Sequence, residues 1–131
     1  MKIKWIKKLF EPPIDRIEVE IKELFDFLFD DYGFQYVKID LGNLVNRKGE
    51  IVFYGPLDAY QVYNDNLCIN IVRLVQRNDY DIYITEKHSN DQHYIFNGMH
   101  LPTRFAYDLS SFASHIKSEL SIGNTIFGKT I

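Results

Sequence analysis

The sequence lacks the features that mark a secreted or membrane-spanning chain. It contains one cysteine, Cys68, so no internal disulfide can form and a disulfide-stapled secreted fold is excluded. No run of about eighteen or more apolar residues is present, which argues against a transmembrane helix. The start of the chain has neither the apolar core nor the small-residue cleavage site of a signal peptide. We therefore expect a cytoplasmic protein.

The sequence also lacks an excess of basic residues. Its 15 Lys and Arg stand against 18 Asp and Glu, which gives a formal net charge of -3 and a pI of about 5.8. Nucleic-acid-binding domains usually carry a basic face, so direct binding of nucleic acid is disfavoured. Residues 1–13 form a basic, amphipathic N-terminal segment. Packing of its Trp5 and Phe10 on the domain is favoured over attachment to a membrane surface.

Recognisable catalytic and metal-binding motifs are missing as well. The seven glycines are scattered at turns and form no phosphate-binding loop, and no Gly-x-Ser-x-Gly element surrounds the serines near the C-terminus. His88 and His93 flank Asp91 in a polar loop, whereas a metal site needs several such ligands to converge. We expect no enzymatic activity, no bound metal and no cofactor.

Apolar and aromatic side chains are abundant. The 131 residues are 46% hydrophobic and 15% aromatic, with ten Phe, nine Tyr and one Trp. This length and composition are typical of one globular domain. Aromatic side chains fill cores, but they also anchor protein interfaces, so the surplus belongs either to the core or to a contact surface.

Two stretches have the residue spacing of amphipathic helices. The first covers residues 15–32, where Asp15 and Glu18 have capping-box spacing and Gly33 follows in the position that ends many helices. The second covers residues 103–121, with apolar residues recurring on one face. Residues 123–131 are expected to fray or to lie as a short extended tail.

Between these helices, runs of β-branched and aromatic residues alternate with turn residues, as in an antiparallel meander. Turns are predicted at Gly55-Pro56, Asn64–Asn66 and Arg77–Asp79, and Gln92–Phe96 is predicted as a further strand that turns at Asn97-Gly98. We therefore predict a single α+β domain over residues 1–131. It has an antiparallel sheet of five or six strands, with the two main helices packed on one face.

Acidic residues are concentrated in the first predicted helix and its approach. Residues 11–31 hold eight Asp and Glu against two Lys and Arg. Glu23, Asp26 and Asp30 fall opposite the apolar stripe and are predicted to be exposed. This face is either a solvated helix surface or a complement to a basic protein partner. The competing candidate contact surface is the sheet, with Tyr60, Tyr63 and Tyr83.

The order of these elements has a familiar layout. An acidic helix ends in Asp30-Asp31-Tyr32-Gly33-Phe34, a late strand reads Tyr80-Asp81-Ile82-Tyr83-Ile84, and a helix closes the chain. This layout resembles that of the small bacterial immunity proteins that neutralise polymorphic toxins, including those of contact-dependent growth inhibition. The resemblance implies a cytoplasmic, non-enzymatic inhibitor that masks the active site of a cognate toxin domain, with a basic nuclease as the expected partner.

The resemblance assigns no binding residue, and the basic N-terminal decapeptide departs from a uniformly acidic surface. The alternative function is a small α+β enzyme or ligand-binding domain. Its site would lie near residues 88–100.

Overall fold

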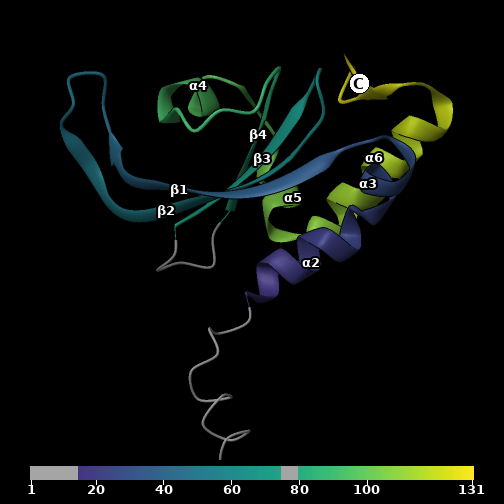
Figure 1. Cartoon of the computed structure of the whole chain (residues 1–131), viewed down its shortest axis with the longest axis horizontal. Helices are drawn as coiled ribbons and strands as arrows, with labels where there is room; N and C mark the ends of the chain where they lie inside the picture. Colours follow the sequence, from purple (N-terminus) through teal and green to yellow (C-terminus); the bar gives the residue numbers. More distant parts are fainter. Residues whose placement is uncertain (1–14, 75–79) are drawn as a thin grey trace, which may run out of the picture.

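Five consecutive strands form one antiparallel sheet in the order β1–β2–β3–β4–β5. The computed structural model describes residues 15–74 and 80–131. The strands are β1 (Gln35–Val45), β2 (Ile51–Tyr63), β3 (Cys68–Leu74), β4 (Tyr80–Thr85) and β5 (Met99–His100) (Figure 1). The predicted α+β class with an antiparallel meander is confirmed.

Both predicted helices pack on the same face of the sheet, and each is divided into two. The first consists of α2 (Arg16–Leu24) and α3 (Asp26–Asp31), which meet at Phe25; the second consists of α5 (Thr103–Tyr107) and α6 (Leu109–Ile122), which meet at Asp108. Their apolar stripes and one side of the sheet form the main core. Phe25 and Phe112 join the two helix pairs by edge-to-face contact, with ring centroids 5.6 Å apart.

This main core supplies most of the packing energy. Its fully buried members include Tyr60, Ile71, Ile82 and Ile116. Burial of one such large apolar side chain contributes roughly 1.5–3 kcal/mol. The thiol of Cys68 is also fully buried, and burial raises its pKa to about 12, so it is not a nucleophile in the folded protein.

Asp15 fixes the start of α2 to the sheet. Its Oδ1 atom accepts hydrogen bonds from the backbone N–H groups of Ile17 and Glu18, at 3.1 and 3.2 Å, as the predicted N-cap should. Its Oδ2 atom accepts from Lys38 Nζ on β1 at 2.8 Å and from the Tyr60 hydroxyl on β2 at 2.9 Å. One side chain therefore satisfies the helix end and ties it to two strands.

The C-terminal residues differ from the predicted tail. They form a small hairpin of β6 (Thr125–Ile126) and β7 (Lys129–Thr130). Glu119 on α6 holds this hairpin, because its carboxylate accepts hydrogen bonds from the N–H groups of Phe127 and Gly128 at 2.7 and 2.8 Å. The prediction of a frayed end was wrong because this anchor lies outside the tail itself.

Two local predictions within the meander were also wrong. Gln92–Phe96 forms the short helix α4 rather than a strand, because the Asp91 side chain accepts the N–H of His93 and caps it. Gly55-Pro56 is not a turn, since β2 runs through it from Ile51 to Tyr63. The predicted turn at Asn64–Asn66 is confirmed, whereas Arg77–Asp79 and the basic segment 1–13 lie outside the described residues.

The opposite face of the sheet carries a smaller core under α4. It contains Leu41, Leu57, Ala59, Val72 and Ile95, which are buried. None of the helices in the described part of the chain has the length and apolarity that a membrane crossing requires.

Candidate functional site

A two-stranded arm extends from the sheet where β3 ends. Leu57 on β2 pairs with Leu74 on β3, and between Ile51 and Pro56 the described partner of β2 is β1 alone. We call residues 42–56 the arm. It curves away from the strands of the sheet, as Figure 1 shows at the free end of β1 and β2.

The bend at the base of the arm depends on two glycines. Gly42 has a positive φ of 66°, which favours glycine, and a register shift in the ladder occurs around it. A Cβ atom on Gly55 would collide with the carbonyl oxygen of Gly42. The oxygen of the Asn43 side chain accepts a hydrogen bond from the Gly55 N–H at 2.7 Å, which links the two strands at the point where Gly42 and Gly55 cross. Proline follows at position 56, where the β3 ladder has not yet begun and no N–H is needed there.

Helix α4 lies in the concave side of the arm and is fixed there by Gln92. The Gln92 carboxamide donates to the carbonyl oxygen of Leu41 at 2.6 Å and to that of Asn43, while its oxygen accepts the N–H of Val45 at 3.0 Å. These are three backbone groups of β1. The side chain thus replaces part of a neighbouring strand and holds α4 against the base of the arm.

A groove of about 620 Å³ lies between the arm and α4. Leu44, Val52 and Phe53 of the arm form one wall. Phe96 and His93 of α4 also line it, with Leu57, Val72 and Tyr83 contributed by the sheet. Its size is in the range of roughly 300–1,000 Å³ that is usual for ligand sites. The lining is mainly aliphatic and aromatic, so the groove can hold an apolar group.

Tyr83 and the groove's charged residues fix its chemistry. The Tyr83 ring lies between Phe96, at 5.1 Å and edge-to-face, and His100, at 4.7 Å and stacked. Burial raises the pKa of the Tyr83 hydroxyl, so Tyr83 is neutral near pH 7. The carboxylate of Asp81 lies 3.0 Å from Nε2 of His100. Arg47, at the tip of the arm, makes no salt bridge within residues 15–74 and 80–131.

The arm exposes an unusual run of apolar residues. The exposed fractions are 44% for Ile51, 57% for Val52 and 73% for Tyr54, and Phe53 between them is 36% exposed. Such runs are normally buried or functional. The run makes the arm a candidate contact surface.

The three acidic residues predicted for a contact surface lie on the outside of the protein. Glu23, Asp26 and Asp30 are all exposed, as expected from their spacing. Within the described part of the chain none of the three forms a salt bridge. Phe27 and Phe29, which neighbour them in sequence, are half-buried and pack against the main core. We call Glu23, Asp26 and Asp30 the acidic surface; it belongs to α2 and α3, which pack on the opposite face of the sheet from the groove.

The three predicted tyrosines do not form one surface. Tyr60 is fully buried in the main core, so its assignment to a contact surface is corrected. Tyr60 and Tyr63 are an odd number of positions apart on β2, and side chains alternate between the two faces of a strand. Tyr83 lines the groove, whereas Tyr63 does not.

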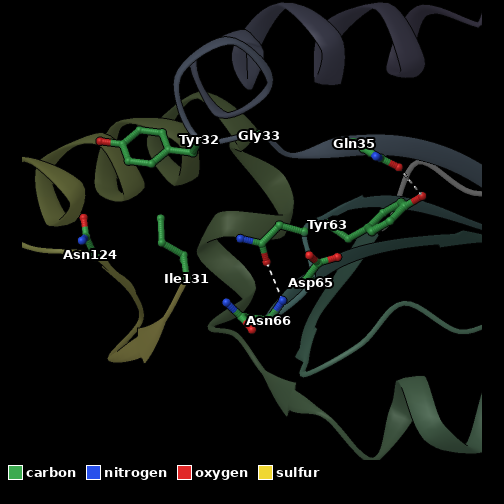
Figure 2. Close-up of a pocket in the computed structure, with 9 residues that line it drawn as sticks. Tyr32, Gly33, Gln35, Tyr63, Asp65, Asn66, Asn124 and Ile131 are labelled. Atoms are coloured by element: carbon green, nitrogen blue, oxygen red, sulfur yellow. Dashed lines mark hydrogen bonds between the residues drawn. The ribbon is translucent and has the colours of Figure 1, made fainter.

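Tyr63 belongs to a second, polar pocket of about 440 Å³ at the β2–β3 turn. Its hydroxyl donates to Gln35 at 3.1 Å, and Figure 2 shows Asp65 and Asn66 across the pocket from Asn124 and Ile131. The Asn64 side chain accepts the N–H groups of Asn66 and Leu67, both at 2.9 Å, so this amide serves the turn. The pocket brings together neither ionised pairs nor a nucleophile.

The histidines of residues 88–100 lie in separate contacts. His88 stacks on Tyr63 with centroids 4.0 Å apart, His93 lines the groove, and His100 stacks on Tyr83. Among the described residues, no group of three or more His, Cys, Asp and Glu side chains has the arrangement of a metal site.

The most strongly coupled charges belong to the fold. Asp58 is 8% exposed and lies 3.9 Å from Lys38 and 4.0 Å from Arg73. Burial raises the pKa of its carboxyl, although both cations oppose that rise. Lys38 also pairs with Asp15 at the start of α2, so these four residues form one set of paired charges between α2 and the sheet.

Comparison of the chain with protein-family models, with curated proteins and with solved structures finds no match. The function must therefore be inferred from the chain's own chemistry.

Sequence reasoning missed the arm and most of the groove. Tyr83 was predicted as a contact residue, and His93 and Phe96 fall in the predicted 88–100 region, but Leu44, Val52 and Val72 were given no role in a site. The available signal was the apolar run Ile51–Tyr54, whose residues alternate onto both faces of a strand before a proline. A strand with apolar residues on both faces is expected to be covered on both faces. Within the described residues, however, this run remains exposed.

Proposed function

We propose that this protein binds another protein and acts as the immunity protein of a cognate toxin domain in the cytoplasm, covering the toxin's active site. The observation that carries the proposal is the exposed apolar run on the arm, with Val52 at 57% and Tyr54 at 73% exposure. Aromatic side chains in such positions are frequent anchors of protein interfaces. A protruding arm is also suited to a concave partner surface, and active sites are usually concave.

The acidic surface adds electrostatic selectivity to this proposal. Its three carboxylates form no salt bridge within residues 15–74 and 80–131, and they favour a basic partner because complementary charge accelerates encounter and disfavours wrong partners. Such steering acts through the field of the whole protein and does not require the acidic surface itself to be buried in the complex. We therefore propose that the arm anchors a basic toxin domain and that α2 and α3 attract it.

The first experiment is co-purification with the product of the neighbouring reading frame, followed by dissociation kinetics. Tyr54→Ala should raise the dissociation rate by roughly 30-fold, corresponding to about 2 kcal/mol for an aromatic anchor. The matched control is Tyr107→Ala, since Tyr107 on α5 is 70% exposed and distant from the arm in the chain. Equal dissociation rates for the two variants would remove the arm from the interface, and the absence of any complex would overturn the immunity function.

A second candidate function, ligand binding near residues 88–100, is favoured by the groove. His93 and Phe96 come from that region and line an apolar groove of about 620 Å³.

A further inference from the structure

We infer that the groove between the arm and α4 binds a lipophilic carboxylate, with the apolar chain along the sheet and the carboxylate on Arg47. The inference rests on the second candidate function, and its test uses no toxin, so its failure can be distinguished from a failure of toxin binding. It names the chemical class of the ligand, which follows from the apolar lining and from the groove's unpaired charge.

The apolar lining of the groove determines the chemistry of the main part of the ligand. Leu44 and Val52 come from the arm, Val72 from β3 and Phe96 from α4. Four separate elements thus present aliphatic or aromatic groups to one space of about 620 Å³. An extended hydrocarbon chain would remove this apolar surface from water.

The charged residues of the groove determine which head group the ligand carries. Two fully charged side chains line the groove, Arg47 and Asp81. Asp81 lies 3.0 Å from Nε2 of His100 and is thereby already engaged. Arg47 makes no salt bridge in the described part of the chain. Within the described residues, Arg47 is therefore the charged lining residue that has no partner, and its guanidinium matches a carboxylate through two parallel hydrogen bonds.

The walls of the groove are held in place without a ligand. Gln92 binds the backbone of Leu41, Asn43 and Val45, which fixes α4 relative to the arm. The edge-to-face contact of Tyr83 with Phe96 fixes α4 to the sheet. Binding therefore requires little ordering of the protein, which favours affinity.

The test uses decanoate as the probe and its neutral analogue decanol as the comparison. Both are titrated into the full chain while backbone amide shifts are followed by NMR. We expect saturable binding of decanoate, with the largest shifts at Leu44, Val72 and Phe96, and roughly tenfold weaker binding of decanol.

A matched pair of variants tests the charge. Arg47→Gln should weaken decanoate binding about tenfold and leave decanol binding unchanged. Lys48→Gln, which removes the neighbouring cation outside the groove lining, should leave both affinities unchanged. Both positions are exposed, so neither change threatens the fold.

Three results would overturn the inference. Equal affinity for decanol and decanoate would show that the groove binds an apolar ligand without recognising its carboxylate. Equal losses of decanoate affinity in Arg47→Gln and Lys48→Gln would show that the positive charge of the arm tip attracts decanoate in general, without a specific pair with Arg47. Absence of saturable binding, or shifts confined to other surfaces, would remove the ligand site while leaving toxin binding untouched.

Discussion

Asp15 uses the two oxygens of its carboxylate for different purposes. One oxygen caps α2, and the other receives hydrogen bonds from Lys38 and Tyr60. Burial by itself raises the pKa of Asp15, but the hydrogen bonds from Lys38, Tyr60 and the Glu18 N–H outweigh it and lower the pKa to about 2. The ionised form is therefore the one that the fold stabilises.

Replacement of Asp15 by alanine should be costly. The variant loses an N-cap, worth about 1 kcal/mol, and a charge-assisted hydrogen bond, worth about 1.5–3 kcal/mol. It also leaves the hydroxyl of the buried Tyr60 without its partner. We expect a total loss of about 3 kcal/mol in the free energy of unfolding, measured by urea denaturation at pH 7. Asp108→Ala, which removes an exposed cap of α6, should cost less, and an equal loss would contradict the anchoring role.

The pH dependence of stability should report the same residue. Because the folded-state pKa of about 2 lies below the unfolded value of about 3.9, the stabilisation is complete above the unfolded value. It is lost as the pH falls from about 4 through about 2. The difference in unfolding free energy between the native protein and Asp15→Asn should therefore shrink over that window. A difference that stays constant between pH 5 and pH 2 would contradict the assignment.

At the scale of the element, the position of α4 depends on the side-chain amide of Gln92. In Gln92→Ala, the N–H of Val45 and the carbonyl groups of Leu41 and Asn43 lose their partner. We expect a loss of about 1–3 kcal/mol and faster hydrogen exchange at the Val45 amide. Gln35→Ala is the control, since Gln35 lies on the same strand and its side chain accepts a hydrogen bond from the Tyr63 hydroxyl, away from α4. Unchanged exchange at Val45 would show that Gln92 does not hold the arm.

The elements differ in how far their sequences determine them. The helices over 15–32 and 103–121 were predictable because each carries a long apolar stripe, and Asp15 and Gly33 also mark the ends of the first. The sequence of Gln92–Phe96 is too short for periodicity, and its aromatic and β-branched residues suggest a strand. Its helical state follows from the Asp91 cap and from contacts with β1 that are 47 to 51 positions away in the chain. The groove was hidden for the same reason, because it needs the arm and α4 to be placed together.

At the scale of the whole molecule, the acidic surface should act through association rates. Reversal of Glu23, Asp26 and Asp30 to Lys should slow binding of a basic toxin domain by roughly tenfold or more at low salt and leave dissociation nearly unchanged. The side chains are exposed, so the fold should be retained. Stopped-flow association as a function of ionic strength is the measurement, and at high salt the variant and the native protein should converge. Unchanged association at low salt would leave the arm as the better-supported contact.

The crossing of Gly42 and Gly55 has a consequence for how this protein can diversify. The backbone at the base of the arm leaves no space for a side chain on Gly55, so the bend tolerates almost no substitution. The residues beyond it, such as Ile51, Val52 and Tyr54, are exposed and are free of that restriction. Substitutions at these exposed positions can therefore change which partner the arm contacts without changing the direction in which the arm leaves the sheet.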